Sequence, residues 1–374
     1  MKTKIQSRSP FTSLLFKSHC VFCLILLTLA TNLNIIQAAT AEKIATDIAI
    51  PWGMTQLPGG ELLITERSGT LYLLKADGTK QSISGLPVIT NLGQGGLLDV
   101  ILHPKYQENG WIYLSYSSSE GEGEGANTTI IRAKLKGTTL TDIEQLYKAS
   151  PNSKKGQHFG SRLAFDDAGY LYFSVGDRGN RSVNPQGLTR DGGKIYRLHD
   201  DGKIPVDNPF VTSSKPAVYS YGHRNPQGMA KHPKTGEIWA HEHGPRGGDE
   251  VNIIAAGKNY GWPVISYGIN YNGTSFTEIT KKEGMEQPIY YWDPSIAPSG
   301  MAFVTGDKYP EWKGHLLVGS LKFNYLVLCK LEGNKIVATE IVQKDIGRVR
   351  NVVQLADGFI YVATDNDAIY RLNP

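Results

Sequence analysis

The sequence predicts an all-β protein, specifically a six-bladed β-propeller of four-stranded antiparallel blades. A turn containing glycine, followed by a short aromatic and aliphatic run, recurs six times at intervals of 44 to 78 residues. Each interval can hold one four-stranded blade with its loops. Amphipathic periodicity of helical length is nearly absent. A chain of 374 residues with 41 Gly and 19 Pro can form such a ring as one domain.

The repeated turn places the blades along the chain. Its glycines are Gly60, Gly110, Gly169, Gly236, Gly314 and Gly358. Several copies are followed by another strand-like run, at residues 70–74, 194–198 and 368–372. The sixth copy ends almost at Pro374, so we expect Ile44 to Trp52 to supply the strand that completes the last blade. Closing the ring in this way would remove exposed sheet edges.

Residues 1–41 have the pattern of a secretory signal peptide. Four basic residues and no acidic residue accompany an apolar run from Val21 to Ala30, and Ala39 to Ala41 offer a cleavage site. An apolar run of about ten residues is too short to cross a bilayer of roughly 30 Å. We therefore expect a periplasmic or secreted protein without stable membrane insertion after cleavage. Residues 42–374 would form a single catalytic propeller domain.

Charge and cysteine counts exclude several classes of partner and bond. Four of the 39 basic residues and none of the 35 acidic residues lie in the leader, so the mature chain is balanced at 35 of each. No basic stripe remains that would indicate nucleic acid or an anionic membrane as a partner. Cys20 and Cys23 also belong to the leader, which leaves Cys329 without an intrachain partner. Its apolar neighbours predict a buried, inert thiol.

The candidate chemistry lies in polar loops between predicted strands. His158 and Asp177 occupy the loops on either side of the strand Tyr170 to Val175, so their side chains can meet. Arg348 and Arg350 alternate on a strand-like segment and can face one side, where they would bind anions. Residues 242–250 mix glycines with carboxylates, which suits a hard cation with oxygen ligands.

Taken singly, these residues also have structural explanations. Gln94 fits ordinary turn chemistry, a lone His158 is more often structural than catalytic, and residues 224–228 fit a turn fixed by proline. Lys322 fits a solvated strand position. Taken together, the groups indicate a small polyanionic ligand at the centre of the ring, held by arginines, an amide, a lysine and a cation.

The motifs that carry these groups resemble, in the same order, those of the soluble PQQ-dependent glucose/sorbosone dehydrogenases. The chain is more similar to the compact periplasmic aldose sugar dehydrogenases than to the longer glucose dehydrogenases, and the resemblance runs from about Trp52 to Arg371. The motifs are Gln94-Gly-Gly-Leu-Leu-Asp, His158 with Gly176-Asp177, Tyr221-Gly-His-Arg-Asn-Pro-Gln-Gly, His243-Gly-Pro-Arg-Gly-Gly-Asp-Glu, Asn259-Tyr-Gly-Trp-Pro, Ala297-Pro-Ser-Gly and Gly347-Arg-Val-Arg.

The resemblance implies a six-bladed propeller that oxidises aldose sugars at C1 to lactones. It also implies that His158 takes the proton of the anomeric hydroxyl as hydride passes to PQQ, while Asp177 orients His158 and supports its imidazolium. PQQ would carry the redox chemistry and the protein would position it. The positions that match PQQ-binding residues are Gln94, Arg224, Asn225, Tyr271, Lys322, Arg348 and Arg350.

The resemblance further implies two calcium ions. One would bridge PQQ to the backbone carbonyls of Gly244 and Pro245 and act as a Lewis acid. The second, structural ion would use Glu250 and the carbonyl of Tyr260. Asn270 and Tyr271 stand where a further carboxylate is sought, so the remaining ligands of this second site stay open.

Other assignments also stay open at this point. The residues Trp262, Tyr267, Trp292 and Ser299 fall near the expected mouth of the site, where they either contact a sugar or pack between blades. The preferred aldose, the electron acceptor and the oligomeric state are not legible in the sequence.

Two rival functions remain. A calcium-dependent propeller lactonase needs a metal-bound water but no basic pocket of the size of PQQ, and Arg348 with Arg350 argues against it. A non-catalytic binding propeller could share the fold, since fold alone does not determine function. The presence of both His158 and Asp177 argues against this second rival.

Overall fold

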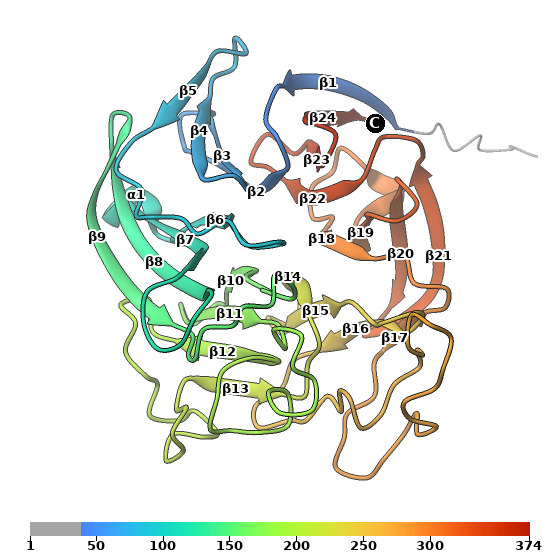
Figure 1. The fold of residues 1–374 in the computed structure, drawn as a ribbon. Coiled ribbons are helices and arrows are strands. Elements are labelled where there is room, and N and C mark those ends of the chain that lie inside the picture. The colour runs from blue at the N-terminus through green and yellow to red at the C-terminus, as the bar shows by residue number, and fades with distance from the viewer. Residues whose placement is uncertain (1–38) are drawn as a thin grey trace, which may run out of the picture. The chain divides into compact units, whose positions relative to one another are not determined.

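The computed structural model describes residues 39–374, which form six four-stranded antiparallel sheets around a common centre (Figure 1). The predicted six-bladed β-propeller is therefore confirmed. Helix in these residues is limited to α1 (Tyr106–Asn109) and a 3₁₀ turn (Pro310–Trp312). Within the described part of the chain, no helix is long and apolar enough to cross a membrane. The predicted leader lies outside the described residues, except for Ala39 to Ala41.

The first three blades each use four consecutive strands, and the first strand of each lies nearest the centre in Figure 1. Blade 1 consists of β2 (Pro51–Gln56), β3 (Leu62–Glu66), β4 (Thr70–Leu74) and β5 (Lys80–Ile83). Blade 2 consists of β6 (Leu97–Leu102), β7 (Trp111–Ser118), β8 (Asn127–Lys136) and β9 (Thr139–Lys148). Blade 3 consists of β10 (Leu163–Phe165), β11 (Leu171–Val175), β12 (Lys194–Leu198) and β13 (Val218–Tyr221).

The remaining blades follow the same order, apart from the last strand of blade 6. Blade 4 consists of β14 (Pro226–Lys231), β15 (Ile238–Glu242), β16 (Asp249–Ile253) and β17 (Tyr290–Trp292). Blade 5 consists of β18 (Pro298–Phe303), β19 (Leu316–Ser320), β20 (Leu326–Glu332) and β21 (Lys335–Gln343). Blade 6 consists of β22 (Val349–Gln354), β23 (Ile360–Thr364), β24 (Ala368–Asn373) and β1 (Thr40–Thr46).

The N-terminal strand closes the ring, as the sequence predicts. β1 runs antiparallel to β24, from Thr40 opposite Asn373 to Thr46 opposite Ala368. The expected bounds, Ile44 to Trp52, were wrong. Asp47 and Ile50 both have positive φ angles, of 59° and 54°, and they turn the chain inward. Trp52 then belongs to β2, the innermost strand of blade 1.

The six repeated glycines occupy equivalent turns, each between the first and second strands of a blade. All six have positive φ angles, between 70° and 97°. Glycine adopts this conformation without the steric cost that a Cβ atom brings. These short turns lie together at one end of the inner strands. The loops at the other end are free to differ, and they carry the candidate site.

The hydrophobic core is divided into clusters between neighbouring blades. Six of these clusters each join two adjacent sheets, including the pair that meets where the ring closes. Each second strand, such as β3, β11 and β23, is therefore buried on both faces. Cys329 lies in the cluster between blades 4 and 5, and burial raises the pKa of its thiol to about 12. The prediction that this thiol is buried is confirmed.

The turn glycines should be needed for their backbone conformation alone. Gly169 has a φ of +84°, and a Cβ atom added there would meet no neighbouring atom. We predict that Gly169→Ala lowers the free energy of unfolding by about 1–2 kcal/mol, because an L-residue is disfavoured in this region. Gly169→Asn should lose less, since Asn tolerates positive φ. Urea denaturation checks this, and equal stability of the Gly169→Ala variant and the native protein would contradict it.

Candidate active site

The predicted site residues come from loops of five blades that meet at one end of the inner strands. Gln94 precedes β6, His158 precedes β10, Arg224 precedes β14 and Arg348 precedes β22, whereas Asp177 and Lys322 follow the second strands of blades 3 and 5. The long segment between β16 and β17 also reaches this end. It pairs Asn259 with Tyr221 and Ile269 with Arg246. Residues far apart in the sequence therefore share one site.

Two adjoining cavities lie at this end of the ring and share Pro245 and Tyr271. The larger, of about 660 Å³, is lined by Gly244, Lys322 and Arg348 among others. The smaller, of about 180 Å³, is lined by residues that include His158, Asp177 and Arg224. A basic wall and a histidine–carboxylate pair thus face neighbouring spaces.

His158 and Asp177 are directly hydrogen-bonded. The Nδ1 atom of His158 lies 2.6 Å from Oδ1 of Asp177. The other ring nitrogen, Nε2, is not used in this hydrogen bond. Only 13% of the His158 side chain and 1% of the Asp177 side chain are exposed. A carboxylate on Nδ1 favours the tautomer in which that nitrogen carries the proton and Nε2 is a proton acceptor.

The local charges keep this pair in the form that a general base requires. Burial lowers the pKa of His158, although Asp177 opposes the shift, so the imidazole is neutral near pH 7. Burial alone would raise the pKa of Asp177. The hydrogen bonds from His158 and Trp262 and the nearby positive charges together outweigh burial, so the pKa of Asp177 falls below its ordinary value. Asp177 is thus an anion beside a neutral imidazole.

Asp177 is fixed by two further donors and by its own loop. Its Oδ1 accepts a hydrogen bond from the Gly179 amide at 2.7 Å, and its Oδ2 accepts one from the Trp262 indole at 2.8 Å. The side chain of Asn184 donates to the Asp177 carbonyl. Lys194 in turn donates to the carbonyls of Asn184 and Gly192 from a buried position. The carboxylate therefore has little freedom to turn away from His158.

Arg224, Lys322 and Arg348 supply the basic wall. Arg224 donates to the His243 carbonyl at 3.0 Å and lies 3.4 Å from the Tyr271 hydroxyl. Arg348 is about half exposed and donates to the Leu321 carbonyl at 3.0 Å. Lys322 is exposed. These groups combine fixed geometry with free donor capacity, which suits an anionic ligand.

The other three residues predicted to bind PQQ do not line either cavity. Arg350 is 8% exposed and forms a two-point ion pair with Asp365, at 2.9 and 2.8 Å. Asn225 is buried, and its Oδ1 accepts a hydrogen bond from the Gly160 amide. Gln94 is exposed, and its Oε1 accepts a hydrogen bond from the His158 amide at 2.8 Å. Each of these three side chains therefore bonds another residue near the site and does not face either cavity.

The turn between β15 and β16 brings two predicted carbonyl ligands to the cavities. Its glycines are required, since a Cβ atom on Gly244 would lie 2.3 Å from the carbonyl oxygens of Gly247 and Gly248. Asp249 holds the turn by accepting hydrogen bonds from the Gly244 amide and the Ser295 hydroxyl. Gly244 and Pro245 both line the larger cavity.

Glu250 faces a second carboxylate, Glu242, which the sequence analysis placed in a cation-binding segment but did not assign as a ligand of this site. Glu242 and Glu250 are direct partners across β15 and β16, so their side chains share one face. Burial, followed by the charge of Glu242, raises the pKa of Glu250 to about 8. Both residues, with Tyr260, line a space of about 10 Å³, close to the volume that one water-sized sphere needs. A buried carboxylate beside a partly buried one can bind a cation.

Asn270 and Tyr271 do not reach this carboxylate pair. Both line the smaller cavity beside His158, and Asn270 accepts a hydrogen bond from Arg181 at 2.9 Å. The carboxylate next to Glu250 is instead that of Glu242, on the neighbouring strand. Among residues 39–374, no three His, Cys, Asp or Glu side chains gather closely enough to hold a metal ion by themselves.

Comparison with known proteins identifies the family. Residues 48–371 match the family model described as Glucose / Sorbosone dehydrogenase. The chain belongs to the glucose/sorbosone dehydrogenase family. It is 41% identical over 327 residues to aldose sugar dehydrogenase YliI of Escherichia coli strain K12, covering 85% of this chain and 88% of the relative. The family resemblance and the prediction of an oxidoreductase are thereby confirmed.

Two solved structures of family members share the fold. The apo form of the soluble aldose sugar dehydrogenase of Escherichia coli superposes with a TM-score of 0.84 at 38% identity, covering 89% of this chain and 98% of that chain. The PQQ-bound aldose sugar dehydrogenase of Streptomyces coelicolor superposes with a TM-score of 0.74 at 28% identity, covering 90% and 98%. Family membership supports sugar oxidation as the reaction class.

The four residues left open as sugar contacts have different surroundings in this family member. Trp292 and Ser299 are buried in the blades, and the Ser299 hydroxyl donates to the Arg350 carbonyl. Tyr267 stacks on Tyr291 with ring centroids 3.9 Å apart. Only Trp262 lines the smaller cavity. Packing thus accounts for Trp292 and Ser299, while Trp262 borders the space beside His158.

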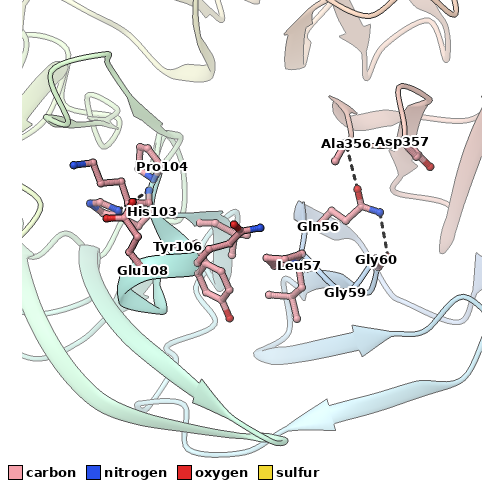
Figure 2. A pocket seen from close by; sticks show the side chains of 14 residues that line it. Gln56, Leu57, Gly59, Gly60, His103, Pro104, Tyr106, Glu108, Ala356 and Asp357 are labelled. Atoms are coloured by element: carbon pink, nitrogen blue, oxygen red, sulfur yellow. Dashed lines mark hydrogen bonds between the residues drawn. The ribbon is translucent and has the colours of Figure 1, made fainter.

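Another cavity, of about 580 Å³, lies at the opposite end of the inner strands (Figure 2). It lies beside the first turns of blades 1, 2 and 6. Gln56 crosses from blade 1 to accept a hydrogen bond from the Ala356 amide, and it donates to the Gly60 carbonyl. His103 accepts a hydrogen bond from the Lys105 amide. None of the predicted site residues lines this cavity.

Asp365 was missed and Glu242 was not assigned as a ligand, yet a signal for them exists in the repeat. In five blades an acidic residue lies within two positions of the end of the second strand. These residues are Glu66, Glu120, Asp177, Glu242 and Asp365. Aligning the six repeats would have placed all five at the same end of the ring.

The His158–Asp177 pair can be tested by titration. Asp177 raises the pKa of His158 through its hydrogen bond and charge, so its removal leaves burial and nearby arginines to lower that pKa further. We predict that Asp177→Asn moves the titration of the His158 imidazole to lower pH, as measured by NMR of the ring nitrogens. Asp345→Asn, at an exposed position before β22, should leave it unchanged. An upward shift in Asp177→Asn would show that the carboxylate does not stabilise the imidazolium.

Proposed function

We propose that the protein is a PQQ- and Ca²⁺-dependent aldose dehydrogenase that oxidises sugars at C1 to the lactone. The observation that carries the proposal is the position of the His158–Asp177 pair beside a basic wall formed by Arg224, Lys322 and Arg348. A proton acceptor and an anion-binding surface thus border adjoining cavities. The PQQ-bound structure of a family member supports the choice of cofactor.

The chemistry of the donor set fits PQQ, which bears three carboxylates and an ortho-quinone. Arg224, Lys322 and Arg348 would bind its carboxylates, with Tyr271 at the junction of the two cavities. Gln94, Asn225 and Arg350 do not line either cavity, and they would support the PQQ site through their hydrogen bonds to neighbouring residues. When bound, PQQ accepts the hydride from C1 and Ca²⁺ polarises its quinone as a Lewis acid.

The protein itself supplies the proton acceptor. Nε2 of the neutral His158 would take the proton of the C1 hydroxyl, because Nδ1 is already bonded to Asp177. The resulting imidazolium is stabilised by the Asp177 carboxylate at 2.6 Å. Trp262 and Gly179 keep that carboxylate in place throughout. A general base of this kind typically contributes about 10²–10⁴-fold to the rate.

Two calcium ions would be bound by separate ligand sets. The Gly244 and Pro245 carbonyls, on the wall of the larger cavity, would hold the ion that contacts PQQ. Glu250 and the Tyr260 carbonyl would hold the structural ion, and Glu242 supplies the further carboxylate. A divalent cation there offsets the repulsion between two adjacent carboxylates. Oxygen ligands of this kind suit Ca²⁺.

The remaining partners follow from the reaction. The substrate is an aldose, and a separate electron acceptor, which remains unidentified, must reoxidise the cofactor after each turnover. The predicted leader would direct the enzyme to the periplasm or outside the cell. No nucleic acid partner is proposed, given the balanced charge of residues 42–374.

Reconstitution tests the function directly. Purified apoprotein should gain dye-linked oxidation of glucose or another aldose only when PQQ and Ca²⁺ are added together, with lactone as the product. NAD should not substitute, because the sequence has no strand–GxGxxG–helix unit. Activity with NAD alone, or lactone hydrolysis without PQQ, would overturn the proposal. The second result would favour the lactonase instead.

Replacement of His158 separates proton removal from cofactor binding. We predict that His158→Gln binds PQQ and Ca²⁺ with near-native affinity while its turnover falls by about two to four orders of magnitude. Asp177→Asn should lose less, since a base remains. Arg348→Ala should chiefly weaken PQQ binding and recover part of its rate at high PQQ concentration. Native turnover of His158→Gln at saturating PQQ would show that His158 is not the base.

Chelation tests the structural calcium site. An ion bound only by the folded state adds about 2.7 kcal/mol to stability at a hundred-fold excess over its Kd. EDTA should therefore lower the Tm of the apoprotein, and Glu250→Gln should blunt that response. Glu283→Gln, at an exposed position with no contact to this site, is the matched control. A full EDTA response in Glu250→Gln would reject the assignment.

A further inference from the structure

Arg178 is a buried guanidinium group next to the proposed catalytic pair. Its side chain is fully buried, and it stacks 3.3 Å above the ring centroid of Phe159. Its hydrogen-bond acceptors are main-chain carbonyls, those of Gln157, Lys155 and Ala126. Burial lowers the pKa of Arg178 to about 9. A buried charge is costly to desolvate, so an arginine held only by neutral acceptors calls for a role that an apolar residue could not fill.

The contacts of Arg178 converge on the segment that leads into His158. It crosses from the β11–β12 loop to the β9–β10 loop and donates to the carbonyls of Lys155 and Gln157. Lys155 returns the contact by donating to the Gly179 carbonyl. These hydrogen bonds therefore join the loop of His158 to the loop of Asp177, in addition to the hydrogen bond between the two side chains.

The peptide bond between Gln157 and His158 is held at both of its polar groups. Arg178 donates to its carbonyl oxygen, and its N–H donates to Oε1 of Gln94 at 2.8 Å. These two contacts set the plane of the peptide. They matter because His158 has a φ of +58°, in a region that histidine rarely adopts. Without them, this backbone could relax and move the imidazole away from Asp177.

We infer that Arg178 is a positioning residue for the base: together with Gln94 it fixes the Gln157–His158 peptide and so holds the imidazole against Asp177. The inference rests on the proposed function, because it takes His158 to be the proton acceptor. Arg178 itself lies behind His158 and need not contact the sugar or the cofactor.

The positioning role has a second, measurable consequence for the pKa of His158. Burial lowers this pKa most, Asp177 raises it through its hydrogen bond and charge, and the charges of Arg224 and Arg178 lower it. The hydrogen bond of Asp177 acts more strongly than the charge of Arg178. An imidazole that moves away from Asp177 in Arg178→Met should therefore have a lower pKa, which moves the acid limb of the pH–rate profile to lower pH. Loss of the Arg178 charge alone would move it to higher pH, and lysine at this position should keep the limb in place.

The test compares Arg178→Met and Arg178→Lys with native enzyme loaded with PQQ and Ca²⁺, using glucose and a redox dye. We expect kcat of Arg178→Met to fall about 10- to 100-fold, as for a displaced catalytic group, while KM for glucose changes less than about threefold. Arg178→Lys should recover part of kcat, because one donor remains. Arg190→Met, at an exposed position on the same loop, is the matched control and should keep native kcat.

A second readout does not depend on turnover. In the apoprotein, the His158 imidazole titration followed by NMR should move to lower pH in Arg178→Met and stay in place in Arg178→Lys. A shift to higher pH in Arg178→Met would mean that only a charge was lost, and it would contradict the positioning role. If Arg178→Met does not fold, as judged by circular dichroism, Arg178→Lys decides the matter through kcat. Native kcat in the folded variants would overturn the inference.

The proposed function and the positioning role of Arg178 would be contradicted by different results. If the native protein does not oxidise any aldose with PQQ and Ca²⁺, the proposed function fails, and the role of Arg178 in catalysis fails with it. If the native protein is active but folded Arg178→Lys and Arg178→Met are equally active, only the positioning role is wrong.

Discussion

The pairing of β1 with β24 is the constraint on which the described fold and its site depend. It completes blade 6 with a strand from the other end of the described chain, so that β22 can pack beside β2. Apolar side chains from both blades fill that junction. Closure sets the positions of all the inner strands, and the loops at their ends therefore converge. Since the site draws on five blades, it cannot form in an open ring.

Beneath the site, the inner strands carry paired charges. Arg162 forms a buried ion pair with Asp99 at 2.9 Å and donates to the Gln227 carbonyl. The Gln227 side chain accepts a hydrogen bond from Arg350, which is paired with Asp365. Pairing offsets much of the cost of burying these charges. Asp365 also lies 3.4 Å from the Nε atom of Arg348, so the network holds Arg348 and Arg350 in place before any ligand arrives. This order reduces the conformational entropy lost when a ligand binds.

Much of the fold could be predicted from the sequence, because each blade repeats the same turn followed by a buried strand. A turn such as the one at Gly169 needs positive φ, and the strand after it is buried on both faces, so glycine and an apolar run recur together. The end of β1 was predicted wrongly, because Asp47 and Ile50 adopt left-handed conformations that the sequence pattern does not predict.

The site was harder to predict, because many of its contacts depend on strand register, turns and burial. His158 and Asp177 could be paired from a single strand and its loops. The partnership of Glu242 with Glu250 depends on strand register, and that of Arg350 with Asp365 depends on a turn in the same blade. The sequence pattern does not single out Arg178. Only its burial against the carbonyls near His158 indicates what it does.

The most direct measurement of the central claim is a crystal structure of the protein grown with PQQ and calcium chloride. The account predicts PQQ in the adjoining cavities between Arg224 and Arg348, with Nε2 of His158 facing its quinone and a cation at the Gly244 and Pro245 carbonyls. PQQ bound instead at the opposite end of the inner strands, beside Gln56 and Tyr106, would contradict it. So would a structure in which saturating PQQ leaves both adjoining cavities empty.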